Sequence, residues 1–176
     1  MRFKSVGNKA DLACVVIRNN ESTLAIKVGA PVALDPTGSN LGVDVKSVVS
    51  LAAASQGNFF GIALAALNPG DFGEAQVFGY NGIARTVLTT RSATTATWAS
   101  VAAGSYGEYL TIGTGTGNTA SNGDQALVRV DTAPQTAAQF ARLMETFASI
   151  DTLASSLGPQ SMSVWTTTRK VFLRAM

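Results

Sequence analysis

The sequence contains no histidine and only one cysteine among its 176 residues. Histidine is the commonest general base near neutral pH, and both residue types supply nucleophilic pairs and zinc sites. Carboxylate chemistry remains open, because two carboxylates suffice for glycoside hydrolysis. The eleven Asp and Glu residues are scattered, however, and most lie in predicted turns or near predicted helix ends. We therefore expect no catalytic residues, no cofactor and no metal site.

The single cysteine, Cys14, lies in the apolar run 12–17, and we expect it to be buried as a small hydrophobic residue. One cysteine allows no internal disulfide, which favours synthesis in a reducing compartment, the cytoplasm of a cell. Residues 1–9 lack the apolar core of a signal peptide, and no apolar stretch approaches the length of a membrane span. We expect no contact with a membrane.

Charged residues make up only 14% of the chain, against about a quarter in typical soluble proteins. The net charge is +2, and no basic run is longer than Arg169-Lys170. A nucleic-acid site usually needs a clustered basic face, so we expect no nucleic-acid partner. So few charges favour a surface that partners cover. The alternative is a neutral β surface rich in Thr and Ser.

The central stretch of the chain predicts a β-meander. Residues 59–67 form an apolar run that Asn68-Pro69-Gly70-Asp71 ends as a turn. Residues 73–80 alternate in polarity, which is typical of a strand with two different faces. Tyr80-Asn81-Gly82 then predicts a second tight turn, because an Asn-Gly pair suits a type I′ hairpin. A third strand is expected at 83–88.

Further strands are expected on both sides of this stretch, at residues 10–17, 24–34, 126–130 and 162–176. Pro31 indicates an edge position or the start of a strand. Residues 43–54 fit neither period cleanly, so either a strand or a short helical turn is open there. The glycine-rich segment 113–123 lacks the Gly-Lys-Ser/Thr of a phosphate-binding loop and is interpreted as a flexible loop.

Residues 132–157 predict an amphipathic helix of about six turns. Thr132 and Gln135 resemble a capping box, and Gly158-Pro159 would end the helix. The apolar stripe packs either on a sheet of the same chain or in a seam between subunits. Its members recur at spacings of three and four: Phe140, Leu143, Phe147, Ile150, Ala154 and Leu157.

The predicted fold is mainly β: a small β-barrel or sandwich with one long C-terminal amphipathic helix and a closing C-terminal strand. We expect an N-terminal arm at 1–9 and a β domain at 10–131 that includes a Thr/Gly-rich excursion at 89–125. Residues 132–176 would pack on this domain or be swapped between subunits.

Several segments together resemble one protein family. They are Gly29-Ala30-Pro31-Val32, Phe60-Gly61-Ile62-Ala63, the following Pro-Gly turn, and Asn81-Gly82-Ile83-Ala84. The pattern resembles the small β-barrel of tailed-bacteriophage capsid decoration proteins, also called cement or head-stabilising proteins, and covers about residues 28–88. The resemblance implies an oligomer, such as a homotrimer, on the outer capsid where major capsid protein subunits meet. The implied partners are the major capsid protein and further copies of this chain, and the implied location is the virion.

Two surfaces are candidates for binding. Arg2, Phe3 and Lys4 place an aromatic residue between two cations in the N-terminal arm, and we expect them to contact the capsid; the alternative is a frayed terminus. A second functional reading is a carbohydrate- or host-binding β module of a phage tail or base plate. Trp98, Tyr106 and Tyr109 would then be its stacking groups.

Overall fold

The computed structural model describes residues 12–40, 42–48, 58–87, 89–91, 98–101, 104–112, 125–129, 140–146 and 167–174. These residues form eleven strands and no α-helix. The strands are β1 (Ala13–Asn19), β2 (Pro31–Leu34), β3 (Asp44–Ser47), β4 (Phe59–Ala63), β5 (Phe72–Val87), β6 (Thr89–Arg91), β7 (Trp98–Val101), β8 (Tyr109–Ile112), β9 (Leu127–Arg129), β10 (Ala141–Leu143) and β11 (Thr167–Arg174).

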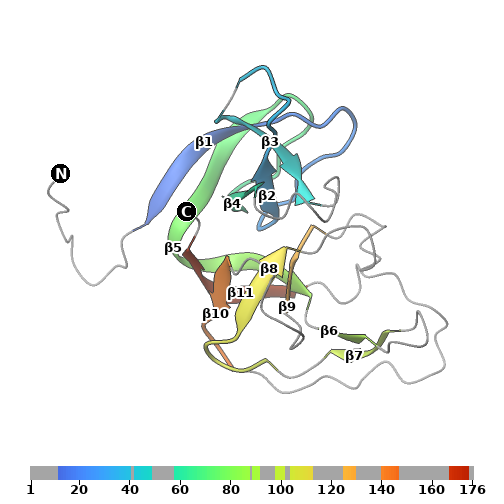
Figure 1. The fold of residues 1–176 in the computed structure, drawn as a ribbon, viewed down its shortest axis with the longest axis vertical. Helices are drawn as coiled ribbons and strands as arrows, with labels where there is room; N and C mark the ends of the chain where they lie inside the picture. The colour runs from blue at the N-terminus through green and yellow to red at the C-terminus, as the bar shows by residue number, and fades with distance from the viewer. Residues whose placement is uncertain are drawn as a thin grey trace, which may run out of the picture.

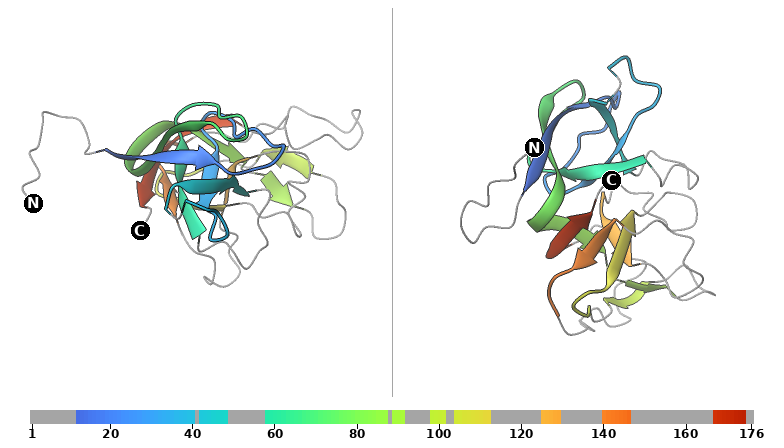
Figure 2. Two further views of the ribbon diagram at one scale, coloured as in Figure 1. Left: turned by 90° about the horizontal axis from the view of Figure 1, so that it is seen from above. Right: turned by 60° about the vertical axis from the view of Figure 1, so that its left-hand side comes forward.

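The long strand β5 belongs to two closed rings of five strands each. The first ring runs β1-β3-β2-β4-β5 and closes because β5 also pairs with β1. The second ring runs β5-β11-β10-β8-β9 and closes where β9 pairs with β5. Figure 1 and the right-hand view of Figure 2 show the two rings one above the other, joined by β5. The predicted β-barrel is therefore confirmed.

The first ring encloses a core to which each of its five strands contributes. Alternate positions along β1 and β5 point inward, so that Ile17 and Ala75 are fully buried. Ile26 lies before β2 and forms an isolated antiparallel bridge with Leu67. The members of this core are Ile17, Ile26, Ala30, Val32, Val45, Ala63, Leu67 and Ala75.

A second core fills the other ring and extends onto β2 and β4 of the first. Phe59 of β4 stacks on Phe140, which precedes β10, with 4.6 Å between ring centroids. Gln125 is also buried between the rings: its side chain accepts a bond from the Lys27 amide and donates one to the Ala25 carbonyl, both at 2.7 Å. The buried members are Ala33, Val48, Phe59, Ile62, Ala84, Leu110, Ile112, Leu127, Ala141, Leu143, Val171 and Leu173.

The predicted turn at Tyr80-Asn81-Gly82 is wrong, because β5 runs through it without a break. Here β5 passes from the first ring to the second: residues 72–78 pair with β1, and residues 78–86 pair with β11. Gly79 has a φ of 98°, in the region that favours glycine. The signal that predicted a hairpin marks a change of direction within one strand, stabilised by pairing with β11.

Two buried amide side chains hold this change of direction. Gln76 Nε2 donates to the carbonyls of Phe78 and Tyr80, at 3.1 and 2.9 Å. Gln76 Oε1 accepts from Asn81 Nδ2 at 3.0 Å, and Asn81 Oδ1 accepts from the Ile83 amide at 2.9 Å. Both side chains are therefore satisfied inside the protein, as buried polar groups require.

The predicted C-terminal helix is also wrong where the structure describes it, because residues 141–143 form β10. This strand pairs with β8 on one side and β11 on the other. Ala141 and Leu143 are buried while Arg142 is exposed, which is the two-residue period of a strand. Pairing with two neighbours outweighs the helical spacing of the sequence. The rest of the predicted stripe lies outside the described residues: Phe147, Ile150, Ala154 and Leu157.

Other expectations at single positions had mixed outcomes. Pro31 is the first residue of β2, as predicted. Residues 44–47 of the ambiguous segment form a strand, β3. Cys14 is exposed rather than buried, because it shares the outward face of β1 with Val16. An apolar run therefore did not establish burial on both faces of that strand.

We predict that Gly29→Ala destabilises the protein more than Gly70→Ala does. Both glycines have positive φ, 75° and 85°, so each alanine costs roughly 1–2 kcal/mol. A Cβ at Gly29 would lie 2.0 Å from the backbone oxygen of Ile83 on β5, whereas one at Gly70 meets nothing within 4 Å. Overpacking should therefore add about 1–3 kcal/mol at Gly29 alone. Urea unfolding of the two variants measures this difference, and equal losses would contradict the close approach of this loop to β5.

Candidate interaction surface

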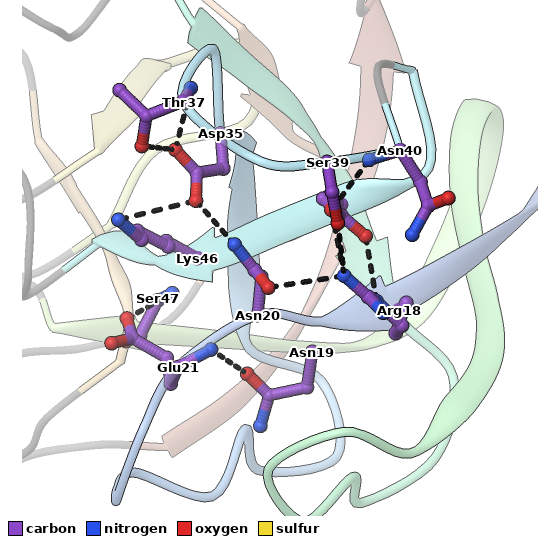
Figure 3. Close-up of polar contacts among 11 residues, drawn as sticks. Arg18, Asn19, Asn20, Glu21, Asp35, Thr37, Ser39, Asn40, Lys46 and Ser47 are labelled. Carbon is purple, nitrogen blue, oxygen red and sulfur yellow. Dashed lines mark hydrogen bonds and ion pairs between the residues drawn. The ribbon is translucent and has the colours of Figure 1, made fainter.

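The first candidate site is a polar network at one end of the first ring, formed by β1, β3 and the residues after β2 (Figure 3). Asp35 is buried there. Its Oδ1 accepts bonds from the Thr37 amide and hydroxyl, and its Oδ2 accepts from Asn20 Nδ2 and Lys46 Nζ at 2.7 and 3.1 Å. A carboxylate has about four acceptor positions, and four donors already occupy those of Asp35.

The second carboxylate of the network, Asp44, is fully buried and faces Arg18 of β1. Arg18 Nε and Nη2 donate to its two oxygens at 2.7 and 2.8 Å, a two-point ion pair. The Asn40 amide donates to Asp44 Oδ2 at 2.9 Å. This pair joins β1 to β3 where they run parallel, since Arg18 and Asp44 are register partners.

The surroundings of both carboxyl groups lower their pKa. Burial by itself would raise the pKa of Asp35, but hydrogen bonds from Thr37, Asn20 and Lys46 outweigh it and hold that pKa well below its usual range. The hydrogen bonds from Arg18 lower the pKa of Asp44, and they outweigh the effect of burial. Both groups are ionised and engaged with protein donors. The network thus stabilises the fold, and the described residues contain no cluster of three or more metal-ligating side chains.

We predict that the free energy of unfolding falls as the pH drops below about 4, the ordinary aspartate value. A carboxyl group with a lowered folded-state pKa stabilises the protein above its unfolded pKa, and this stabilisation is lost as the pH falls through the folded value. Asp35→Asn and Asp44→Asn should each lower stability at pH 7, by an amount that shrinks toward pH 2. Urea unfolding at several pH values tests this, and a variant whose deficit does not change with pH would contradict it.

The second candidate is a largely exposed row of side chains that crosses four neighbouring strands of the second ring, β5, β11, β10 and β8. Figure 1 shows these four strands. Tyr80 lies opposite Phe172, Phe172 opposite Arg142, and Arg142 opposite Tyr109. Directly opposed residues in antiparallel strands point to the same face, so these four side chains form one line. At the usual strand spacing the line is about 14 Å long. We call it, together with Phe78, the aromatic–arginine row.

The row exposes aromatic surface to solvent. Tyr80 is 39% exposed, Tyr109 38% and Phe78 40%, whereas Phe172 is half-buried. The rings of Phe78 and Phe172 meet edge to face, with centroids 5.4 Å apart. Aromatic pairs prefer this edge-to-face arrangement, which stabilises the two rings against each other. The row is therefore an ordered surface on strands rather than a set of independent side chains.

The charge of the row comes from Arg142. Its guanidinium carbon lies 4.3 Å from the centre of the Tyr109 ring, and Nη2 donates to the Tyr109 hydroxyl. Within the described part of the chain, no carboxylate lies at ion-pair distance from Arg142. The nearby Glu145 is instead engaged by the Lys170 amide and the Arg169 side chain. Among the described residues, only Tyr109 accepts a hydrogen bond from the Arg142 side chain, which leaves most of its donor positions for a group outside this part of the chain.

The residues predicted from the sequence are only partly brought together by this surface. Tyr109 belongs to the row, and Tyr106 is 65% exposed in the turn before β8. Nothing is described of the Trp98 side chain, and Arg2, Phe3 and Lys4 lie outside the described residues. Phe140 and Leu143 pack in or against the core of the second ring rather than on a helix stripe.

Sequence reasoning missed Tyr80, Arg142 and Phe172 as surface residues. Phe172 lies in the strand predicted at 162–176, but the residues beside its side chain depend on strand register. Arg142 lies in the segment 132–157 that was predicted to be a helix, so its position between two aromatic residues could not be anticipated. The only local signal was the alternation of polarity along each single strand, which indicates which of its residues face solvent but not which residues lie beside them.

No membrane-spanning helix occurs in the part of the chain that the structure describes. A comparison with models of known protein families gives no match to this chain. A comparison with curated proteins likewise finds none that matches it.

Proposed function

We propose that this protein is a capsid decoration protein, which binds the outer surface of a viral capsid as an oligomer and stabilises the head shell. The observation that supports this most is the aromatic–arginine row. Aromatic residues and arginine are enriched at the centres of protein interfaces and supply much of the binding energy there. The row presents both on a rigid sheet, as a surface that docks on another protein requires.

The fold that carries the row also suits a protein that stabilises a capsid shell. Each ring is closed, the two share β5, and the core of the second ring includes residues of β2 and β4 from the first. The segments on which the resemblance to decoration proteins rests lie in or next to β2, β4 and β5. The proposed partners are the major capsid protein and further copies of this chain, which the resemblance suggests form a homotrimer.

Mass spectrometry of purified virus particles from the source of the gene tests this proposal. We expect peptides of this chain in a fixed copy number relative to the major capsid protein, and their loss on treatments that strip the outer surface but leave the shell closed. A chain that is absent from particles, or present only in trace amounts, would contradict the proposed function. Light scattering of the free protein tests the oligomer separately, and a clean monomer at micromolar concentration would remove that part.

A truncation tests whether the N-terminal arm contributes to docking. Removal of residues 1–6 deletes Arg2, Phe3 and Lys4 but leaves β1, which begins at Ala13, intact. We expect unchanged folding and oligomer size, and lower occupancy on particles. Occupancy equal to that of the full chain would exclude the arm and leave the barrel surface as the docking site.

The second candidate function is a carbohydrate- or host-binding module of a phage tail or base plate. The exposure of Tyr106 and Tyr109 favours it, because sugars stack on exposed aromatic faces. Against it, the Arg142 guanidinium already covers one face of the Tyr109 ring. A glycan array distinguishes the two: specific binding that Tyr106→Ala or Tyr109→Ala removes would favour the carbohydrate module.

A further inference from the structure

We propose that the aromatic–arginine row binds an acidic, partly apolar protein segment, and that Arg142 pairs with a carboxylate of that segment. The inference rests on the proposed function, since it names the chemistry of the capsid surface on which the protein docks.

Charge complementarity identifies the partner chemistry. Arg142 lies third of four in the line of opposed residues, with Phe172 on one side and Tyr109 on the other. Lys170, two residues from Phe172 on β11, is also exposed. The nearby carboxylate of Glu145 is paired with Arg169, so among the described residues it does not neutralise Arg142. A planar guanidinium with unused donors matches a carboxylate at two points.

The aromatic flanks make this match stronger than an isolated surface ion pair. Exposed pairs contribute little because water screens them. A partner that covers Tyr80, Phe172 and Tyr109 would exclude water around Arg142, and the surrounding contacts would then strengthen the ion pair. The guanidinium of Arg142 stacks on the face of the Tyr109 ring, and this cation–π contact favours one position of the charged group. Apolar residues that alternate with carboxylates in the partner would fit these neighbours.

Single-stranded nucleic acid is the main competing ligand class, because aromatic residues and cations on a sheet also bind stacked bases and phosphates. The low overall charge argues against it: the net charge is +2, and the cations described at this position are Arg142 and Lys170, which do not form an extended basic face. Nucleic-acid sites use a clustered basic face that follows the backbone of the strand. The charge of the row therefore favours an acidic protein segment.

The test is an NMR titration of the full-length protein with a synthetic Glu-Leu-Glu-Leu-Glu peptide and its Gln-Leu-Gln-Leu-Gln counterpart. We expect the acidic peptide to shift the Arg142 side-chain Nε–H signal and the amides of Tyr109 and Phe172. The amide peptide should bind about tenfold more weakly, because a hydrogen bond to a charged group is lost. Added salt should weaken only the acidic peptide.

Three variants assign the effect to Arg142. Arg142→Gln removes both the charge and the planar pair of donors that a carboxylate can bind at two points. Arg142→Lys keeps the charge but not that pair of donors. Each substitution should lower affinity about tenfold. Lys27→Gln removes one exposed positive charge in the segment between β1 and β2, outside the row, and should change affinity by less than about twofold. Amide spectra that are unchanged away from the row show that each variant is folded.

Equal binding of the two peptides, or unchanged affinity in Arg142→Gln, would overturn the inference. So would tighter binding of an oligothymidylate than of the acidic peptide, which would assign the row to nucleic acid. Particle mass spectrometry separates this result from the proposed function. A chain that is abundant in particles but ignores the acidic peptide overturns only the inference. A chain that binds the peptide through Arg142 but is absent from particles supports the surface chemistry and removes the capsid assignment.

Discussion

The pairing of one strand with two rings is the constraint on which the rest of this structure depends. The first half of β5 closes the first ring by pairing with β1, and its second half pairs with β11 and β9 in the second ring. The chain can pass from one ring to the other only if β5 changes direction without losing its hydrogen bonds. Gly79 provides the backbone conformation, and the buried amides of Gln76 and Asn81 satisfy the polar groups there.

The functional surface follows from this arrangement. Tyr80 lies next to the point where β5 enters the second ring, and it points outward opposite Phe172. The contacts that join the rings, such as Phe59 on Phe140, support the strands behind the row. The ion pairs of Asp35 and Asp44 stabilise the far end of the first ring. Buried polar contacts therefore support the fold, and the exposed aromatic residues with Arg142 are left for binding.

The sequence predicted those features that depend on local residues. Alternation and Pro-Gly chemistry identified β4, the first half of β5 and β11, and Pro31 marked the start of β2. It could not predict which strands pair, and so it missed the passage of β5 through Asn81-Gly82. The sequence also missed β10. This strand has only three residues, too few for an alternation that stands out from the helical spacing around it, and its structure is decided by pairing with β8 and β11. The aromatic–arginine row could not be predicted either, because its members come from four strands that are distant in sequence and are brought together only by strand pairing.

Hydrogen exchange along β5 in the full-length protein tests the central claim, that one strand joins the two rings into a single stable unit. If this is correct, amides of β5 in the first ring, near Ala75, and in the second ring, near Ala84, will exchange with the same free energy of opening. That free energy will equal the one from global unfolding, because neither ring opens alone. Exchange in which one half of β5 opens at a much lower free energy than the other would show that the rings are independent and would contradict the account.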